Sequence, residues 1–121
     1  MNNFVVWFEI PVSNLDRAMK FYSKVMSVEL QSMDMGTSKQ ATFPFVQGVA
    51  SGSLKESKES EPSAAGTMIY LNGGEDLSAP LACVEAAGGK IIKKKTSIGE
   101  HGFIAIFKDT EDNHIALHSR K

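Results

Sequence analysis

The chain has 121 residues, of which 42% are hydrophobic and 22% are charged, and its formal net charge is -1. These values are typical of one folded domain of ordinary size and exclude a chain that is disordered throughout. A net charge so close to zero also provides no strongly basic face for phosphate groups, so we expect no nucleic-acid partner.

The cysteine content and the N-terminal residues indicate the cellular compartment in which we expect the protein. Cys83 is the one cysteine, so no intrachain disulfide can form, and its apolar, alanine-rich neighbourhood predicts a small buried side chain. Residues 1–4 contain no basic stretch leading into a long apolar run. No window approaches the roughly 20 apolar residues of a membrane span. We therefore expect a cytoplasmic protein with no membrane partner.

The first half of the chain begins with a predicted strand over residues 4–12. Its even positions are all apolar and should pack on helices, whereas the odd face carries Trp7 and Glu9. Ser13 predicts the N-cap of a following helix, with Asp16 in the capping-box position. Three further strands are expected, over residues 28–33, 40–45 and 49–54.

A charged segment without periodicity, residues 55–65, predicts a connector to a second half with the same order of elements. A strand over residues 67–71 should lead into a helix capped at Leu77 or Ser78, and the glycine pair at 88–89 should end that helix. The last strands are expected over residues 90–94, 102–107 and 113–119.

The repeated order of elements predicts an α+β fold in a single domain spanning residues 1–121. The first βαβββ repeat covers about residues 1–55, and the second covers about residues 66–121. Two such repeats form half-barrels whose inner faces surround a cleft, while the helices cover the outside.

Two motifs resemble the vicinal oxygen chelate superfamily, which includes glyoxalases, bleomycin resistance proteins and extradiol dioxygenases. These proteins open with a strand, then V-S/T-D-L, a small residue and F-Y, and residues 12–22 read V-S-N-L-D-R-A-M-K-F-Y. Their closing D-P-x-G-N turn is similar to residues 109–113, in which Thr110 and Asp112 replace the common Pro and Gly. The resemblance covers nearly all of the chain and implies the glyoxalase-like fold.

The resemblance also implies where a metal would bind. Enzymes of this superfamily hold a divalent metal with His and Glu side chains, and the metal acts as a Lewis acid toward vicinal oxygens of the substrate. The first and last ligand positions fall at Trp7 and Ala116, which cannot coordinate a metal. The other two fall within residues 49–54 and 66–70, which contain no His, Asp, Glu or Cys. We therefore expect no metal of the usual kind.

Glu9 and His118 are the candidate catalytic residues. Alternation directs both toward the cleft, where a carboxylate beside an imidazole could form an acid/base pair. The alternatives are a Glu9 that only hydrogen-bonds a neighbouring polar group and a His118 that is solvated or structural. His114 lies on the same predicted face but next to a turn, so we expect it to be exposed.

Candidate ligand-binding residues come from both repeats. Aromatic side chains could form a pocket wall, and His101 lies in a glycine-flanked loop that could close over a cleft or simply be a mobile surface loop. Core packing is the alternative for the aromatic residues. The complete set is Trp7, Glu9, Phe43, Tyr70, His101 and His118.

These features favour a protein that binds a small organic molecule without the usual metal. The alternative is a metal-dependent lyase, isomerase or dioxygenase with unexpected ligands such as Glu9 and His118. A metal-free acid/base enzyme that uses Glu9, and a subunit with no ligand, are further alternatives. Half-barrels of this architecture commonly dimerise, so by analogy we expect a homodimer.

Overall fold

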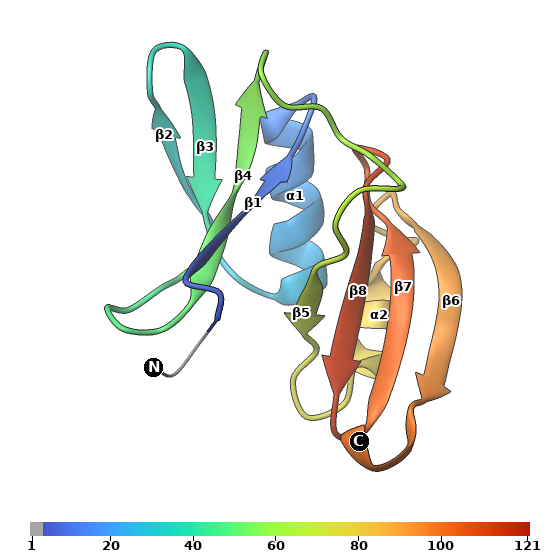
Figure 1. Cartoon of the computed structure of the whole chain (residues 1–121). Coiled ribbons are helices and arrows are strands. Elements are labelled where there is room, and N and C mark those ends of the chain that lie inside the picture. The colour runs from blue at the N-terminus through green and yellow to red at the C-terminus, as the bar shows by residue number, and fades with distance from the viewer. Residues whose placement is uncertain (1–3) are drawn as a thin grey trace.

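The computed structural model describes residues 4–121, so residues 1–3 at the start of the expected first repeat lie outside the described residues. The order of strand, helix and three strands occurs twice, as the sequence predicts (Figure 1). The elements of the first repeat are β1 (Trp7–Pro11), α1 (Leu15–Met26), β2 (Gln31–Asp34), β3 (Ser38–Thr42) and β4 (Ser51–Ser57). Those of the second are β5 (Tyr70–Asn72), α2 (Ser78–Cys83), β6 (Lys90–Ser97), the short 3-10 helix η1 (Gly99–His101), β7 (Phe103–Lys108) and β8 (His114–Ser119).

Each repeat forms its own four-stranded mixed sheet, with strand orders β1-β4-β3-β2 and β5-β8-β7-β6. In both sheets the first strand of the repeat lies at an edge and pairs in parallel with the last strand. The other neighbours are antiparallel. The predicted α+β fold of two βαβββ repeats is therefore confirmed, and it leaves β1 and β5 as edge strands of two separate sheets (Figure 1).

Helix α1 links the two sheets through a shared hydrophobic core. The ring of Phe21 lies 5.7 Å from that of Phe107 in β7, and the ring of Tyr22 lies 5.8 Å from that of Phe43, directly after β3. All four side chains belong to one cluster of buried residues. None of the helices in residues 4–121 has the length and apolar character needed to span a bilayer.

The first strand is shorter than predicted, because its pairing with β4 begins only at Trp7, opposite Ser51. Phe4 and Val6 were expected to pack on helices, but they precede this pairing and are 94% and 76% exposed. Ile10, which lies on the same predicted face within the paired segment, is buried. The alternation thus predicts the buried face correctly only where the strand has a partner.

The boundary between β4 and the connector is also different from the prediction. β4 continues to Ser57, because Lys55 and Glu56 pair with β3 across the sheet. The strand that opens the second repeat is reduced to Tyr70–Asn72. The predicted connector therefore starts only after the charged end of β4.

The N-cap of α1 is Asn14, whereas the sequence predicted Ser13. The Asn14 side chain accepts a hydrogen bond of 3.0 Å from the backbone N–H of Arg17. The backbone N–H of Ser13 instead donates to Oε1 of Glu111, at 2.9 Å. The carboxylate of Glu111, near the C-terminal end of the chain, thus accepts the backbone hydrogen bond that Asp16 was expected to accept in a capping box.

The second helix is capped at Leu77, one of the two predicted residues, but it ends at Cys83 and does not reach the glycine pair at 88–89. The chain leaves the helix through a turn in which Gly89 donates its backbone N–H to the carbonyl oxygen of Val84, at 2.9 Å. Cys83 is half-buried and packs against the core, so it is less deeply buried than the sequence predicted.

Candidate functional site

A cavity of about 700 Å³ is lined by residues of the edge strands β1 and β5 and of the segments around them. Glu9 is the only charged side chain among the described residues of this lining. Small-molecule sites are typically clefts of this size with an apolar wall and a few polar groups. The apolar part of the wall includes Phe8, Met26, Phe43, Met68, Ile69 and Leu71.

One glycine allows an aromatic side chain to form part of this wall. Gly52 in β4 is paired with Phe8 in β1, and a Cβ atom at Gly52 would lie 2.5 Å from carbons of the Phe8 ring. A side chain at Gly52 would therefore displace the ring. The Phe8 ring also packs against that of Phe43, with centroids 5.8 Å apart, so the cavity wall is continuous with the buried core.

Glu9 marks the polar edge of the large cavity. Its Oε1 lies 3.6 Å from Nζ of Lys55, and 45% of the Glu9 side chain is exposed. Glu9 also lines a smaller cavity of about 190 Å³, together with Glu61, Ser63 and His114. The same carboxylate therefore borders a large, mostly apolar space and a small space that holds further ionisable side chains.

The structure brings three of the predicted site residues together and separates one aromatic residue from them. Glu9, Phe43 and Tyr70 all line the large cavity. Trp7 lies outside the lining of both cavities, where its ring makes an edge-to-face contact with Phe45 at a centroid distance of 5.5 Å. We therefore place the candidate site around Phe43 and Tyr70, and not around Trp7.

The two predicted histidines lie at a different place. His118 lines another cavity, of about 410 Å³, which shares Tyr70, Leu71 and Asn72 with the large cavity but not Glu9. Nε2 of His118 lies 2.7 Å from the carbonyl oxygen of His101. A carbonyl oxygen can only accept a hydrogen bond, so this contact requires a proton on Nε2 of His118. The side chain of His101 is 74% exposed and lies 3.7 Å from Glu100. The structure thus does not bring Glu9 and His118 into one cavity.

His114 is a site residue that the sequence reasoning missed. It is half-buried and lines the small cavity with Glu9, although its position next to a turn predicted exposure. The signal for its position was available, because His114 shares the alternating face of β8 with Ala116 and His118. The turn hid this signal, since residues beside turns are usually solvated.

The side chains at the expected metal positions do not fit a metal ion. Trp7 is paired with Ser51, and Ala116 is paired with Tyr70, so these neighbouring positions carry neither imidazole nor carboxylate. In the described part of the chain, no group of three or more His, Cys, Asp or Glu side chains could hold a metal. Among residues 4–121, the expected metal positions therefore lack the donor set that the metal-dependent enzymes of the superfamily use.

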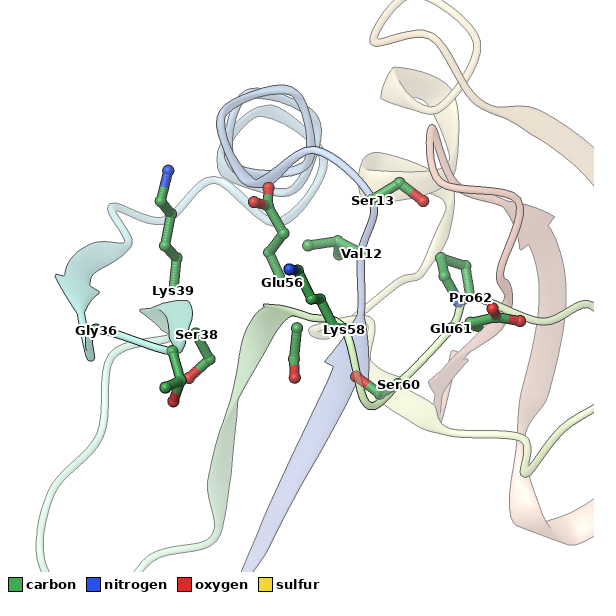
Figure 2. A pocket seen from close by; sticks show the side chains of 12 residues that line it. Val12, Ser13, Gly36, Ser38, Lys39, Glu56, Lys58, Ser60, Glu61 and Pro62 are labelled. Carbon is green, nitrogen blue, oxygen red and sulfur yellow. The ribbon is translucent and has the colours of Figure 1, made fainter.

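A further cavity, of about 390 Å³, lies near the connector and has a mixed polar lining (Figure 2). Its charged residues include Lys39 in β3, Glu56 in β4 and Lys58 directly after β4. Oε1 of Glu56 already accepts a hydrogen bond of 2.8 Å from the backbone N–H of Leu15 at the start of α1. Side chains of both charges line this cavity, and Glu56 is already bonded to the start of α1. The lining therefore does not indicate one kind of ligand.

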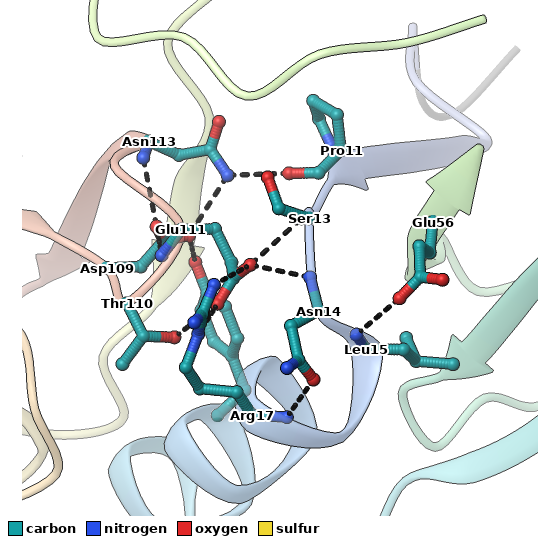
Figure 3. Close-up of polar contacts among 11 residues, drawn as sticks. Pro11, Ser13, Asn14, Leu15, Arg17, Glu56, Asp109, Thr110, Glu111 and Asn113 are labelled. Atoms are coloured by element: carbon teal, nitrogen blue, oxygen red, sulfur yellow. Dashed lines mark hydrogen bonds and ion pairs between the residues drawn. The ribbon is translucent and has the colours of Figure 1, made fainter. Parts of the chain in front are cut away.

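The closing turn of the chain binds the N-terminal end of α1 (Figure 3). The buried carboxylate of Glu111 accepts backbone hydrogen bonds from Ser13 and Asn14, at 2.9 and 2.8 Å, and a bond of 2.7 Å from Nε of Arg17. Burial acts to raise the pKa of Glu111, but the hydrogen bonds from Arg17, Asn14, Thr110 and Ser13 outweigh it and hold this pKa below its usual value. Glu111 thus acts as an ionised cap for the helix.

Asp109 in the same turn is engaged with the buried face of α1. Its carboxylate accepts hydrogen bonds from the Tyr22 hydroxyl, at 2.6 Å, and from the backbone N–H groups of Glu111 and Asn113. Burial raises the pKa of Asp109, although these hydrogen bonds oppose the shift. Burial, together with the charge of Asp109, also raises the pKa of Tyr22 well above its usual value. Asp109 and Glu111 of the closing motif therefore both have structural partners.

Comparisons with known proteins identify the family. The profile of the Glyoxalase/Bleomycin resistance protein/Dioxygenase superfamily matches residues 4–117. A glyoxylase-like domain-containing protein from Didymella fabae is 34% identical over 116 residues, and the alignment covers 93% of this chain and 90% of the relative.

Solved structures share the fold. A mutant of glyoxalase I from Zea mays has a TM-score of 0.76 at 20% identity, covering 95% of this chain and 45% of that chain, so this protein spans less than half of the maize chain. TnmS3, an antibiotic binding protein from Streptomyces sp. CB03234, has a TM-score of 0.70 at 22% identity, covering 100% of this chain and 99% of that chain. The chain belongs to the glyoxalase/bleomycin resistance protein/dioxygenase superfamily, as its opening and closing motifs predicted.

Proposed function

We propose that this protein binds a small organic molecule in the cavity between β1 and β5 and does so without a metal ion. The observation that carries the proposal is the apolar cavity of about 700 Å³, which has Glu9 as its only charged side chain among the described lining residues. A ligand with an aromatic or aliphatic body would replace water against the rings of Phe8, Phe43 and Tyr70. The fold shared with the antibiotic binding protein TnmS3 over the whole chain is consistent with a binding role.

Metal-dependent lyase, isomerase or dioxygenase chemistry is the alternative, and the residues at the metal positions argue against it. Trp7, Ala116 and residues 49–54 and 66–70, where the four ligands were expected, provide no imidazole or carboxylate to hold a divalent cation. Glu9 and His118, the ligands considered from the sequence, line different cavities. No observation favours this second function, so binding is the function that we put forward.

We further propose that two copies associate through the exposed apolar residues at the start of β1 and in the β3–β4 connection. Trp7 and Phe45 are in edge-to-face contact there, and Val46 and Val49 are 65% and 60% exposed. Such clusters commonly mark protein interfaces. Sedimentation should show a homodimer that Val49→Glu converts to a monomer, whereas a wild-type monomer at high concentration would contradict this assembly.

A pair of variants tests the proposed binding function. Ala50 is exposed and lines the large cavity, whereas Ala64 is exposed and lies outside its lining. Ala50→Trp should weaken the binding of phenylbutanol at least tenfold by filling the cavity, and Ala64→Trp should leave it unchanged. Calorimetric titration in the presence of EDTA measures both. Equal affinities of the two variants, or binding that EDTA abolishes, would contradict the proposal.

A further inference from the structure

We infer that the ligand is a cationic amphiphile, with its apolar body in the large cavity and its ammonium group in the small cavity beside Glu9 and Glu61. This inference rests on the proposed binding function and specifies the class of ligand. It follows from how the two cavities adjoin and from the charges and hydrogen-bonding groups that line them.

The two cavities form neighbouring compartments of one site. Glu9, Thr67 and Ile69 line both the space of about 700 Å³ and the space of about 190 Å³. A ligand seated against Ile69 can therefore extend past Glu9 into the smaller compartment. Because the larger compartment is mostly apolar and the smaller one carries most of the ionisable groups, the ligand that satisfies both has one apolar and one polar end.

The formal charges of the lining have one sign. Among the described residues, the only Asp, Glu, Lys or Arg side chains that line either compartment are Glu9 and Glu61. Lys55 lies 3.6 Å from Glu9 but lines neither compartment, and no ion pair of Glu61 occurs within residues 4–121. A cation between these carboxylates is attracted, whereas an anion is repelled.

The neutral groups of the small compartment point to the same kind of ligand. The side-chain amide of Asn113 donates to the carbonyl oxygen of Pro11, at 2.7 Å, and to Oδ2 of Asp109, at 3.1 Å, so both of its N–H donors are used. The carboxylates and the hydroxyl oxygens of Ser63 and Thr67 can accept hydrogen bonds. An ammonium group, which has donors and no acceptor, matches this set.

Three ligands that share one body test the inference in the full-length protein. Phenylbutylamine, phenylbutanol and phenylpentanoate share a phenylbutyl body and differ only in their polar end, which is cationic, neutral or anionic at neutral pH. By calorimetric titration, the amine should bind roughly fivefold to tenfold more tightly than the alcohol, and the carboxylate should bind most weakly. Glu61→Gln should reduce the affinity for the amine to about that for the alcohol and leave the alcohol unaffected. Glu59→Gln is the matched control, because Glu59 is exposed in the same connector but lines neither compartment.

The outcomes separate this inference from the proposed function. If the alcohol and the amine bind equally well, or if Glu61→Gln weakens both ligands alike, the cationic end is wrong and the binding function stands. If none of the three ligands binds, the proposed function fails and the inference fails with it. A preference for the amine that is lost in Glu61→Gln and kept in Glu59→Gln supports the inference.

Discussion

The hydroxyl group of Tyr22 donates a hydrogen bond of 2.6 Å to Oδ2 of Asp109, and both side chains are buried. Tyr22 ends the opening motif of the chain, and Asp109 begins the closing motif, 87 positions later. The bond therefore joins α1 of the first repeat to the last turn of the second. The two motifs that resemble the superfamily are thus the segments that fasten its two repeats together.

Removing this hydroxyl should destabilise the fold. Tyr22→Phe leaves the buried carboxylate of Asp109 without one of its partners, which should lower the free energy of unfolding by about 1–3 kcal/mol. Urea denaturation measures the change. Tyr70→Phe is the control, because Tyr70 is exposed. This variant should lose less than about 0.5 kcal/mol of the free energy of unfolding. Equal stabilities of the two variants would show that the Tyr22 bond contributes nothing.

Glu111 should make the stability depend on pH in the acid range. Its pKa in the folded protein is held below the usual value, so its stabilisation is complete above the unfolded pKa and is lost as pH falls through the folded pKa. Asp109 acts with the opposite sign, because its pKa is raised in the folded protein and protonation of this buried group favours the folded state. The two effects can be separated by substituting Glu111 alone.

Glu111→Gln should lower the free energy of unfolding by about 1–3 kcal/mol at neutral pH, because the charged hydrogen bonds to Arg17 and the helix end are weakened. The difference between wild type and variant should shrink as pH falls below about 4.5, where unfolded Glu111 becomes protonated. Urea denaturation from pH 7 down to a practical limit of about pH 3 measures this difference in the free energy of unfolding. A difference that stays constant over this range would contradict the assigned pKa shift.

A methyl group at Gly52 should disturb both the fold and the cavity. Its carbon would lie 2.5 Å from the Phe8 ring, so Gly52→Ala must displace that ring at a cost of about 1–3 kcal/mol. Because Phe8 lines the large cavity, the affinity for phenylbutanol should fall as well. Gly66→Ala is the control for stability, since the atoms nearest to its added carbon are 3.7 Å away. If Gly52→Ala is as stable as the control, the Phe8 ring does not lie close against Gly52.

The position of the N-cap of α1 can be tested with two neighbouring residues. Asn14→Ala removes the side-chain acceptor for the backbone N–H of Arg17 and should cost about 1 kcal/mol of unfolding free energy. Ser13→Ala should cost less than about 0.5 kcal/mol, because the Ser13 contact with Glu111 uses the backbone N–H. Thermal unfolding of both variants compares them directly, and the reverse ranking would make Ser13 the cap.

Local patterns were sufficient to predict the order of the elements, but contacts between distant segments shifted their boundaries. Ser13 has the chemistry of a cap, yet Glu111, 98 positions away, provides the acceptor for its backbone N–H, and the cap moves to Asn14. Likewise, the polar residues Lys55 and Glu56 look like a connector until β3 pairs with them. A sequence pattern reports the preference of a segment and does not report which partner it meets.

The candidate site shows the same limit. Glu9 was expected in a cleft and lines one, but Trp7, on the same predicted face of β1, lies outside that cavity, whereas Phe8, on the other face, lines it. Alternation does not describe the position along the cleft. His118 is paired with Asn72 at the end of β5, whereas His114 lies at the other end of β8 and lines a cavity with Glu9.

The central claim, that an organic ligand occupies the cavity between β1 and β5 without a metal, can be tested by NMR of methionine methyl groups. Met26 and Met68 line this cavity, whereas Met33 and Met35 are exposed elsewhere and provide internal controls. Titration with phenylbutylamine in EDTA should shift the Met26 and Met68 methyl signals in a saturable way and leave those of Met33 and Met35 in place. Shifts confined to Met33 and Met35, or Met26 and Met68 signals that move only after a divalent metal is added, would contradict the account.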